Sequence, residues 1–235
     1  MQILPIRTKI LHPPQDDLLV AIEDSISEIK NGDVILISSK VVAIHEGCCI
    51  PEAESDKSKL INSEADIVIE TEYRAWPLTV TRHTFLGASG IDESNGNGYL
   101  VLLPEDCFAS AKYLHEFFIT TYKVDDIGII ITDSRSSPFR YGATGVALAW
   151  WGIEPLENHI GKPDLFGREF KYERSNIVDG LAAGAAVVGG ETDECTPIVI
   201  ARDVPNLSFT LADTRNHLLA PFADDTFRVL YEKWL

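Results

Sequence analysis

The chain is short of positive charge and of long apolar runs. Its 235 residues include 20 Lys and Arg against 36 Asp and Glu, a formal net charge of −16. Binding nucleic acid by counterion release needs clustered basic residues, so we expect no nucleic-acid partner. No stretch approaches the ~20 apolar residues of a membrane-spanning helix, and Arg7 and Lys9 interrupt the N-terminal segment. We therefore expect a cytoplasmic protein without a membrane partner.

Common cysteine and nucleotide motifs are missing as well. The four cysteines, Cys48, Cys49, Cys107 and Cys195, show no C-x-x-C spacing, so we expect them to be reduced and mostly structural. Gly161-Lys162 lacks the upstream glycine and the following Ser or Thr of a phosphate-binding P-loop. No G-x-G-x-x-G follows an expected strand either. Familiar nucleotide-binding loops are thus excluded.

What is present is the composition of a globular protein with a substantial core. Hydrophobic residues make up 45% of the chain and charged residues 24%, enough to bury a core without disulfides. The sequence contains no internal repeat and no low-complexity linker, so we expect residues 1–235 to form one domain or two intimately packed parts. Expected strands and helices intermingle, which predicts an α+β or mixed α/β fold.

Hydrophobic periodicity predicts the individual elements. The expected strands cover residues 2–6, 33–42, 99–103, 127–132 and 197–201, the second interrupted near Ser39 and Lys40. The expected helices cover residues 17–30, 105–122, 175–188 and 223–235, with Gly189-Gly190 ending the third. We also expect a short helix within 52–66 and an extended run over 67–81. Residues 142–151 fit a strand or a short helix.

Three acidic segments are the strongest functional signal. They are Gly90 to Asn95, Ile129 to Ser134, and Gly189 to Glu194. An apolar run that ends in Thr132-Asp133 predicts a buried strand that delivers a carboxylate to a sheet edge. Carboxylate oxygens from separate loops suit Mg²⁺ or Mn²⁺, which keep positions open for substrate phosphates. The sequence therefore points to metal-assisted phosphate chemistry.

Each acidic segment also has a simpler explanation. Asp92 and Asn95 can cap an ordinary turn, Asp133 can cap the turn after its strand, and Glu191 can be a solvated loop residue. A calcium-binding EF-hand is excluded, because Gly96 and Leu103 occupy positions that need oxygen ligands. Several cations follow Asp133 and can hold an anionic substrate or pair with surface carboxylates. They are Arg135, Arg140, Lys162, Arg168 and Arg174.

The order of the motifs resembles the coenzyme F420-0:γ-glutamyl ligase family over most of the chain. Gly90 to Asn95 is similar to the family's Gly-Ile/Val-Asp-x-Ser-Asn segment, and Ile130 to Ser134 is similar to its Ile-Ile-Thr-Asp-Thr strand. Gly190-Glu191 resembles the family's Met-Gly-Glu loop. Further similar segments are 32–47, 103–111, 138–142 and 160–169.

The resemblance implies roles for particular residues. It implies metal ligation, by Mg²⁺ or Mn²⁺, at Asp92, Asp133, Ser134 and Glu191. It implies contacts to GTP at Lys9, Ile10, Leu11, His12, Ser39, Lys40, Asn95, Gly189, Gly190, Thr192 and Asp193. Catalytic roles are expected for Asp133, Arg140 and Arg168.

The resemblance also implies an activity. A GTP- and metal-dependent ligase would join L-glutamate to a carboxylate of a coenzyme F420-like acceptor through an acyl phosphate. The implied fold has mixed sheets, packed helices and an intertwined homodimer. A folate or pterin γ-glutamyl ligase on the same scaffold is an alternative. Because Ile44 stands where the family has a nucleotide-contacting lysine, a non-catalytic nucleotide or metal binder is another.

Overall fold

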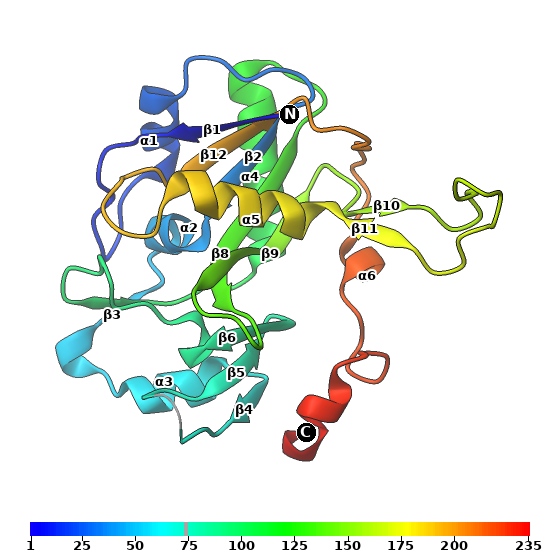
Figure 1. Cartoon of the computed structure of the whole chain (residues 1–235). Coiled ribbons are helices and arrows are strands. Elements are labelled where there is room, and N and C mark those ends of the chain that lie inside the picture. The colour runs from blue at the N-terminus through cyan, green and yellow to red at the C-terminus, as the bar shows by residue number, and fades with distance from the viewer. Residues whose placement is uncertain (73–74) are drawn as a thin grey trace.

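A five-stranded mixed sheet forms the centre of the molecule (Figure 1). The computed structural model describes residues 1–72 and 75–235. Only β2 and β8 run parallel among these five strands, and the other neighbours are antiparallel. In spatial order the strands are β1 (Gln2–Ile6), β12 (Ile198–Arg202), β2 (Val34–Ser38), β8 (Gly128–Ser136) and β9 (Ala143–Trp151).

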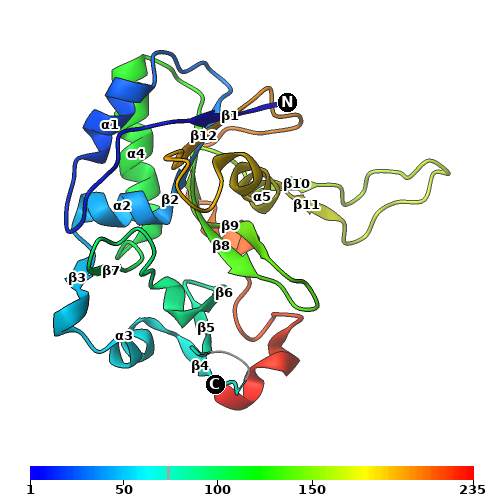
Figure 2. The same cartoon turned by 60° about the vertical axis from the view of Figure 1, so that its left-hand side comes forward.

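Helices cover both faces of this sheet, which explains why Val34 to Ile37 of β2 and Ile129 to Ile131 of β8 are continuous buried apolar runs (Figure 2). Ile35 and Ile37 face a core shared with α1, α2 and α4, whereas Val34 and Leu36 face a core shared with α5. The bounds of these helices are α1 (Leu18–Ser25), α2 (Ser39–Glu46), α4 (Cys107–Tyr122) and α5 (Ile177–Gly189). The predicted mixture of helices and strands is confirmed.

Two element boundaries in the first 50 residues differ from the sequence-based prediction. The strand expected over 33–42 ends at Ser38, and α2 starts at Ser39. Val41, Val42 and Ile44 are buried on this helix, so packing against the core overrides their preference for strands. The helix expected over 17–30 ends at Ser25, although Ile26 and Ile29 remain buried beyond it. The apolar residues beyond Ser25 that suggested a longer helix are therefore buried in a non-helical segment.

A smaller lobe adjoins the central sheet. It contains the sheet β4 (Ile67–Ile69), β5 (Leu78–Thr81) and β6 (Thr84–Gly87), the pair β3 (Cys49–Pro51) and β7 (Tyr99–Val101), and helix α3 (Lys57–Glu64). The extended run expected over 67–81 includes residues 73 and 74, which lie outside the described residues. The 3₁₀ turn η2 (Ala88–Gly90) follows β6 and leads directly to Asp92.

Two arms project from the body. The segment 142–151, left open between strand and helix, is strand β9 and forms a long hairpin with β8. Strands β10 (Leu156–Asn158) and β11 (Arg174–Asn176) carry the loop 159–173, which extends away from the sheet (Figure 1). Within the described chain, no helix has the length and apolar character needed to cross a membrane.

The terminal helix predicted over 223–235 is wrong. The C-terminal part contains α6 (Arg215–Leu218) and two 3₁₀ turns, η3 (Arg228–Leu230) and η4 (Glu232–Trp234). Trp150 Nε1 donates to Thr214 Oγ1 at 2.9 Å, and Tyr231 is buried against Ile69 and Val80 of the small lobe. Burial of one aromatic ring, rather than a helical stripe, thus sets the path of this segment.

Candidate active site

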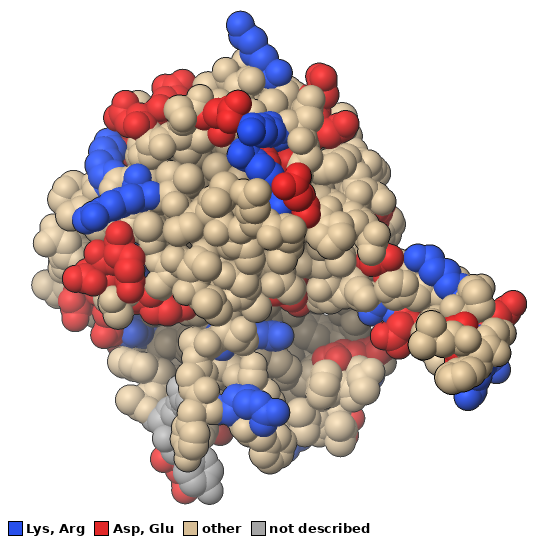
Figure 3. Space-filling view, turned by 45° about the horizontal axis from the view of Figure 1, so that its top comes forward, with Lys and Arg blue, Asp and Glu red and all other residues tan. Residues whose placement is uncertain are grey.

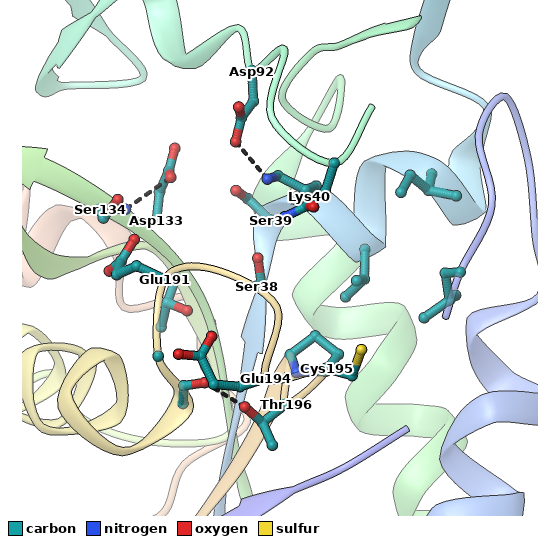
Figure 4. Close-up of a pocket in the computed structure, with 18 of the residues that line it drawn as sticks. Ser38, Ser39, Lys40, Asp92, Asp133, Ser134, Glu191, Glu194, Cys195 and Thr196 are labelled. Carbon is teal, nitrogen blue, oxygen red and sulfur yellow. Dashed lines mark hydrogen bonds and ion pairs between the residues drawn. The ribbon is translucent and has the colours of Figure 1, made fainter. Parts of the chain in front are cut away.

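A cleft of about 670 Å³ lies where the central sheet, the start of α2 and the loop after α5 meet the segment around Asp92 (Figure 4). Its walls come from parts of the chain that are far apart in sequence. They are the N-terminal stretch 8–13, residues 38–44, the acidic turn around Asp92, residues 132–134 and the loop 189–197. All three acidic segments found in the sequence therefore contribute to one cavity.

Asp92 is held by Lys40 and by its own turn. Lys40 Nζ lies 2.6 Å from Asp92 Oδ2, and it donates to the Ser94 carbonyl at 3.0 Å. Asp92 Oδ1 accepts hydrogen bonds from Ser94 N at 2.8 Å and Ser94 Oγ at 2.7 Å. Partial burial opposes ionisation, but Lys40 and Ser94 outweigh it and hold the pKa of Asp92 below its ordinary value. Asp92 thus caps its own turn and also lines the cleft, while its role as a metal ligand remains a prediction.

Asp133 lies on β8 just after an irregularity in its pairing with β9. The register shifts between Ile131 and Thr132, and β8 continues to Ser136 instead of ending at Thr132 as predicted. Such bulges change the direction of side chains and are common beside active sites. Burial, together with the negative charges of Asp92 and Glu191, raises the pKa of Asp133 to about 7. The Ser134 N–H, which donates to Asp133 Oδ1 at 2.8 Å, and Lys40 oppose this shift.

The loop after α5 closes the other side of the cleft. Gly190 has a φ of +79°, a conformation that favours glycine. Asn95 Nδ2 donates to the Thr192 carbonyl at 2.9 Å and so joins the acidic turn to this loop. Glu191 and Glu194 both come from it, and Figure 4 shows them on the side of the cavity that faces Ser38.

The donor chemistry of the predicted metal ligands fits a hard divalent cation. Asp92, Asp133, Ser134 and Glu191 offer oxygen atoms alone. Burial is the main cause of the raised pKa of Asp133, and the negative charges of Asp92 and Glu191, which a cation would neutralise, add to it. Within residues 1–72 and 75–235, no three His, Cys, Asp or Glu side chains are grouped closely enough to hold one ion. The ion pair between Lys40 and Asp92 shows that one of the proposed ligands is engaged elsewhere.

The residues predicted to contact a nucleotide all line this cleft. Lys9, Ile10, Leu11 and His12 form the N-terminal wall, with Lys9 Nζ 3.2 Å from Asp16 Oδ1. The remaining ones are Ser39, Lys40, Asn95, Gly189, Gly190, Thr192 and Asp193. Ile44 is part of the same wall and is 2% exposed. Their shared location agrees with the prediction, and nucleotide binding itself remains a prediction.

Two predicted catalytic residues lie outside the described lining of the cleft. Arg140 is exposed on the β8–β9 hairpin and donates to the Phe139 carbonyl at 3.0 Å. Arg168 is exposed on the 159–173 loop, where its N–H donates to Asp164 Oδ1 at 2.8 Å. Within one chain, these arginines are therefore not brought together with Asp133.

Sequence analysis missed the wall of small residues in this cleft. Gly145, Ala182, Ala185 and Ala186 line it where α5 lies against β9. A Cβ on Gly145 would collide with the carbonyl group of Ala182, so the close approach of helix and strand requires glycine there. The alanine-rich composition of α5 predicted tight packing, but the partner segment could not be identified while 142–151 had no assigned structure.

Basic residues do not gather into a continuous patch on the face drawn in Figure 3. There, Lys and Arg occur singly or in small groups among Asp and Glu. This distribution agrees with the acidic composition.

The similarity to known proteins covers most of the chain. The profile of the F420-0:gamma-glutamyl ligase family matches residues 5–203. Relatives named Coenzyme F420:L-glutamate ligase occur in Methanopyrus kandleri, Methanocaldococcus jannaschii and Natronomonas pharaonis. In the same order, these relatives are 36%, 34% and 33% identical to this chain. The aligned regions cover 85%, 92% and 93% of this chain, and 84%, 87% and 91% of the relatives' chains.

These matches define an enzyme of the ligase class, one that adds glutamate. More narrowly, the chain belongs to the F420-0:gamma-glutamyl ligase family, as the order of its motifs predicts.

Proposed function

We propose that this protein uses GTP and a divalent metal ion to join L-glutamate, in amide linkage, to a carboxylate of a coenzyme F420-like acceptor. Three relatives carry the name Coenzyme F420:L-glutamate ligase, which supports the choice of glutamate and acceptor. The single observation that carries the chemistry is the meeting of Asp92, Asp133 and Glu191 with Lys40 in one cleft.

The reaction needs two transfers. An oxygen of the acceptor carboxylate attacks the γ-phosphorus of GTP, GDP leaves, and an acyl phosphate forms. The amine of glutamate then attacks the acyl carbon, loses a proton, and releases inorganic phosphate. Phosphoryl transfer spreads negative charge over the phosphate oxygens, so charge neutralisation and positioning account for most of the catalysis.

The residues of the cleft have distinct parts in this proposal. Asp92, Asp133, Ser134 and Glu191 would hold Mg²⁺ or Mn²⁺, which neutralises phosphate charge when bound. Lys40, now paired with Asp92, would reach an oxyanion once that carboxylate takes another cation. The walls 8–13 and 189–196 would hold the nucleotide.

We also propose a homodimer formed through the projecting arms. Phe139 is 99% exposed and Phe166 96% exposed, beside Tyr141 and Leu165, which are equally open. Exposed apolar side chains at such density usually mark an interaction surface. Arg140 and Arg168 lie on the same two arms. In such a dimer, the arms of one chain would bring Arg140 and Arg168 to the cleft of the second copy.

Replacing Asp133 with Asn tests the catalytic proposal. Wild-type protein with GTP, Mn²⁺, labelled glutamate and an F420-type acceptor should release phosphate and yield a product heavier by one glutamyl unit. The D133N variant should lose this activity while its circular dichroism is unchanged. Asp24→Asn, an exposed carboxylate on α1, is the matched control and should keep full activity. Full activity of D133N would refute the assignment of Asp133.

A further inference from the structure

The carboxylate of Glu194 is bound by the backbone of its own loop. The Thr192 N–H donates to Glu194 Oε2 at 2.8 Å, and Thr192 Oγ1 donates to Oε1 at 3.1 Å. A Cβ on Gly190 would collide with this carboxyl group, so it lies directly over the glycine. Backbone N–H groups of Thr192, Glu194 and Asp193 hold the pKa of Glu194 below its ordinary value. Successive amide groups that converge on one anion form a nest, the type of backbone site that also binds phosphate.

The loop keeps its shape through contacts that do not involve Glu194. Asn95 Nδ2 donates to the Thr192 carbonyl at 2.9 Å, and the Thr8 N–H donates to the Cys195 carbonyl at 2.9 Å. The Ser38 N–H donates to the Pro197 carbonyl at 2.9 Å. The Thr196 hydroxyl donates to the Gly189 carbonyl. The amide groups therefore stay in place if the exposed side chain of Glu194 rotates away.

The position of this nest matters because it forms part of the cleft wall. Gly190, Thr192 and Glu194 all line the cavity that also contains Lys40 and Asp133 (Figure 4). With Glu194 in its observed position, a negative charge occupies the amide groups that would otherwise be free to bind an anion from the cleft. A substrate anion must compete with this side chain.

We propose that Glu194 occupies an oxyanion site built from the amides of residues 192–194, and that a phosphate group entering the cleft displaces it. The ligand class is an inorganic or nucleotide polyphosphate. The inference rests on the proposed function in one respect, the use of a nucleotide in this cleft. Glu194 thereby acts as an internal competitor that lowers the affinity of the free enzyme for polyanions.

Pyrophosphate is the probe that isolates this site, because it carries neither base nor sugar. Its affinity, measured by calorimetry in the presence of Mg²⁺, is compared among the wild type, E194Q, E194A and D24N. We expect both Glu194 variants to bind pyrophosphate about tenfold more tightly, as for a site open in about a tenth of molecules. D24N removes one negative charge from an exposed position on α1, outside the described lining of the cleft, and should change the affinity less than about twofold.

Two results would overturn the inference. One is an unchanged or weaker pyrophosphate affinity in both E194Q and E194A. The other is an equal gain in D24N, which would show that net charge alone is responsible. Matching thermal melting curves among the four proteins would exclude loss of folding as the cause of either result.

GTP binding to the same four proteins separates this inference from the proposed function. If pyrophosphate binds more tightly to the Glu194 variants while GTP binds to none of the proteins, the oxyanion site is supported and the use of GTP is refuted. If wild-type protein binds and consumes GTP but the Glu194 variants gain no affinity for pyrophosphate, the function stands and the inference is refuted.

Discussion

Lys40 Nζ and Asp92 Oδ2 are 2.6 Å apart, and their contact joins helix α2 of the main body to the acidic turn at the edge of the small lobe. Both side chains are partly accessible, at 24% and 38%. The pair therefore lies at the surface of the cleft, where either member can exchange its partner for a substrate group or a metal ion.

Replacing Lys40 with Met should lower GTP-dependent activity about 100-fold, the usual effect of removing one preorganised group that stabilises transition-state charge. Steady-state phosphate release measures this loss. Lys59→Met is the control, because Lys59 is an 85% exposed lysine whose surface ion pair with Asp56 lies away from the described cleft. An unaltered kcat/KM in K40M would contradict a role for Lys40 in catalysis.

The buried ion pair of Asp33 and Arg202 should dominate the electrostatic stability of the main sheet. Arg202 donates from Nε to Asp33 Oδ1 at 2.8 Å and from Nη2 to Oδ2 at 2.6 Å, and Asp33 is fully buried. Arg202→Met leaves a buried carboxylate without its cation and should lower the free energy of unfolding by about 3 kcal/mol.

Urea denaturation measures this change, with Arg228→Met as control. Arg228 pairs with Glu232 at 3.8 Å on the surface, so its loss should cost less than about 1 kcal/mol. Equal losses of unfolding free energy in R202M and R228M would show that burial does not determine how much the Asp33–Arg202 pair contributes to stability.

His115 should make folding stability depend on pH below about 6.5. Burial lowers the pKa of His115 from 6.5, while a backbone hydrogen bond to Ile127 and the charge of Glu116 oppose the shift. The unfolded chain therefore takes up a proton at a higher pH than the folded chain does. Stability is at its full value above pH 6.5 and falls as the pH drops below it, through the folded-state pKa.

The His115→Gln variant tests whether His115 causes this pH dependence of stability. Its unfolding free energy, measured by urea denaturation at several pH values, should fall less steeply than that of the wild type between pH 6.5 and 5. Identical slopes for the two proteins would assign the pH dependence to other groups.

Polar substitution of the arm residues should dissociate the proposed dimer. Leu165 and Phe166 are 98% and 96% exposed in the single chain, and burying two such side chains in a partner contributes roughly 3 to 6 kcal/mol. The double variant Leu165→Ser, Phe166→Ser should have a monomeric mass by light scattering at concentrations where wild-type protein is dimeric. A monomeric wild-type protein would refute the dimer directly.

Most of the fold could be predicted from hydrophobic periodicity, and the failures have identifiable causes. Strands β1, β2 and β12 were located as short apolar runs, helix α4 by the helical spacing of its apolar residues, and helix α5 by its alanine-rich composition. Val41 and Val42 were misassigned because strand-forming residues also suit a helix that is buried on the core side. The C-terminal segment was misassigned because Tyr231 packs on residues about 150 positions earlier, a contact that no local pattern contains.

Many residues that line the cleft were located from the sequence, but their arrangement was not. The motifs around Asp92, Asp133 and Glu191 identified three walls of the cleft from sequence alone. The ion pair from Lys40 to Asp92 could not be inferred, because it joins residues that are 52 positions apart in different lobes. The position of Glu194 over Gly190 likewise could not be predicted. It depends on the conformation of the loop, which no periodicity in the sequence indicates.

The contact between Gly145 and α5 limits how this cleft can change. Helix and strand are in contact through backbone atoms there. No substitution can therefore shorten a side chain to widen the space between them. Widening the cleft at this contact would therefore require a shift of α5 itself. Because the loop 190–196 begins where α5 ends, such a shift would carry the proposed phosphate site with it, and the width of the cleft and its affinity for phosphate would change together.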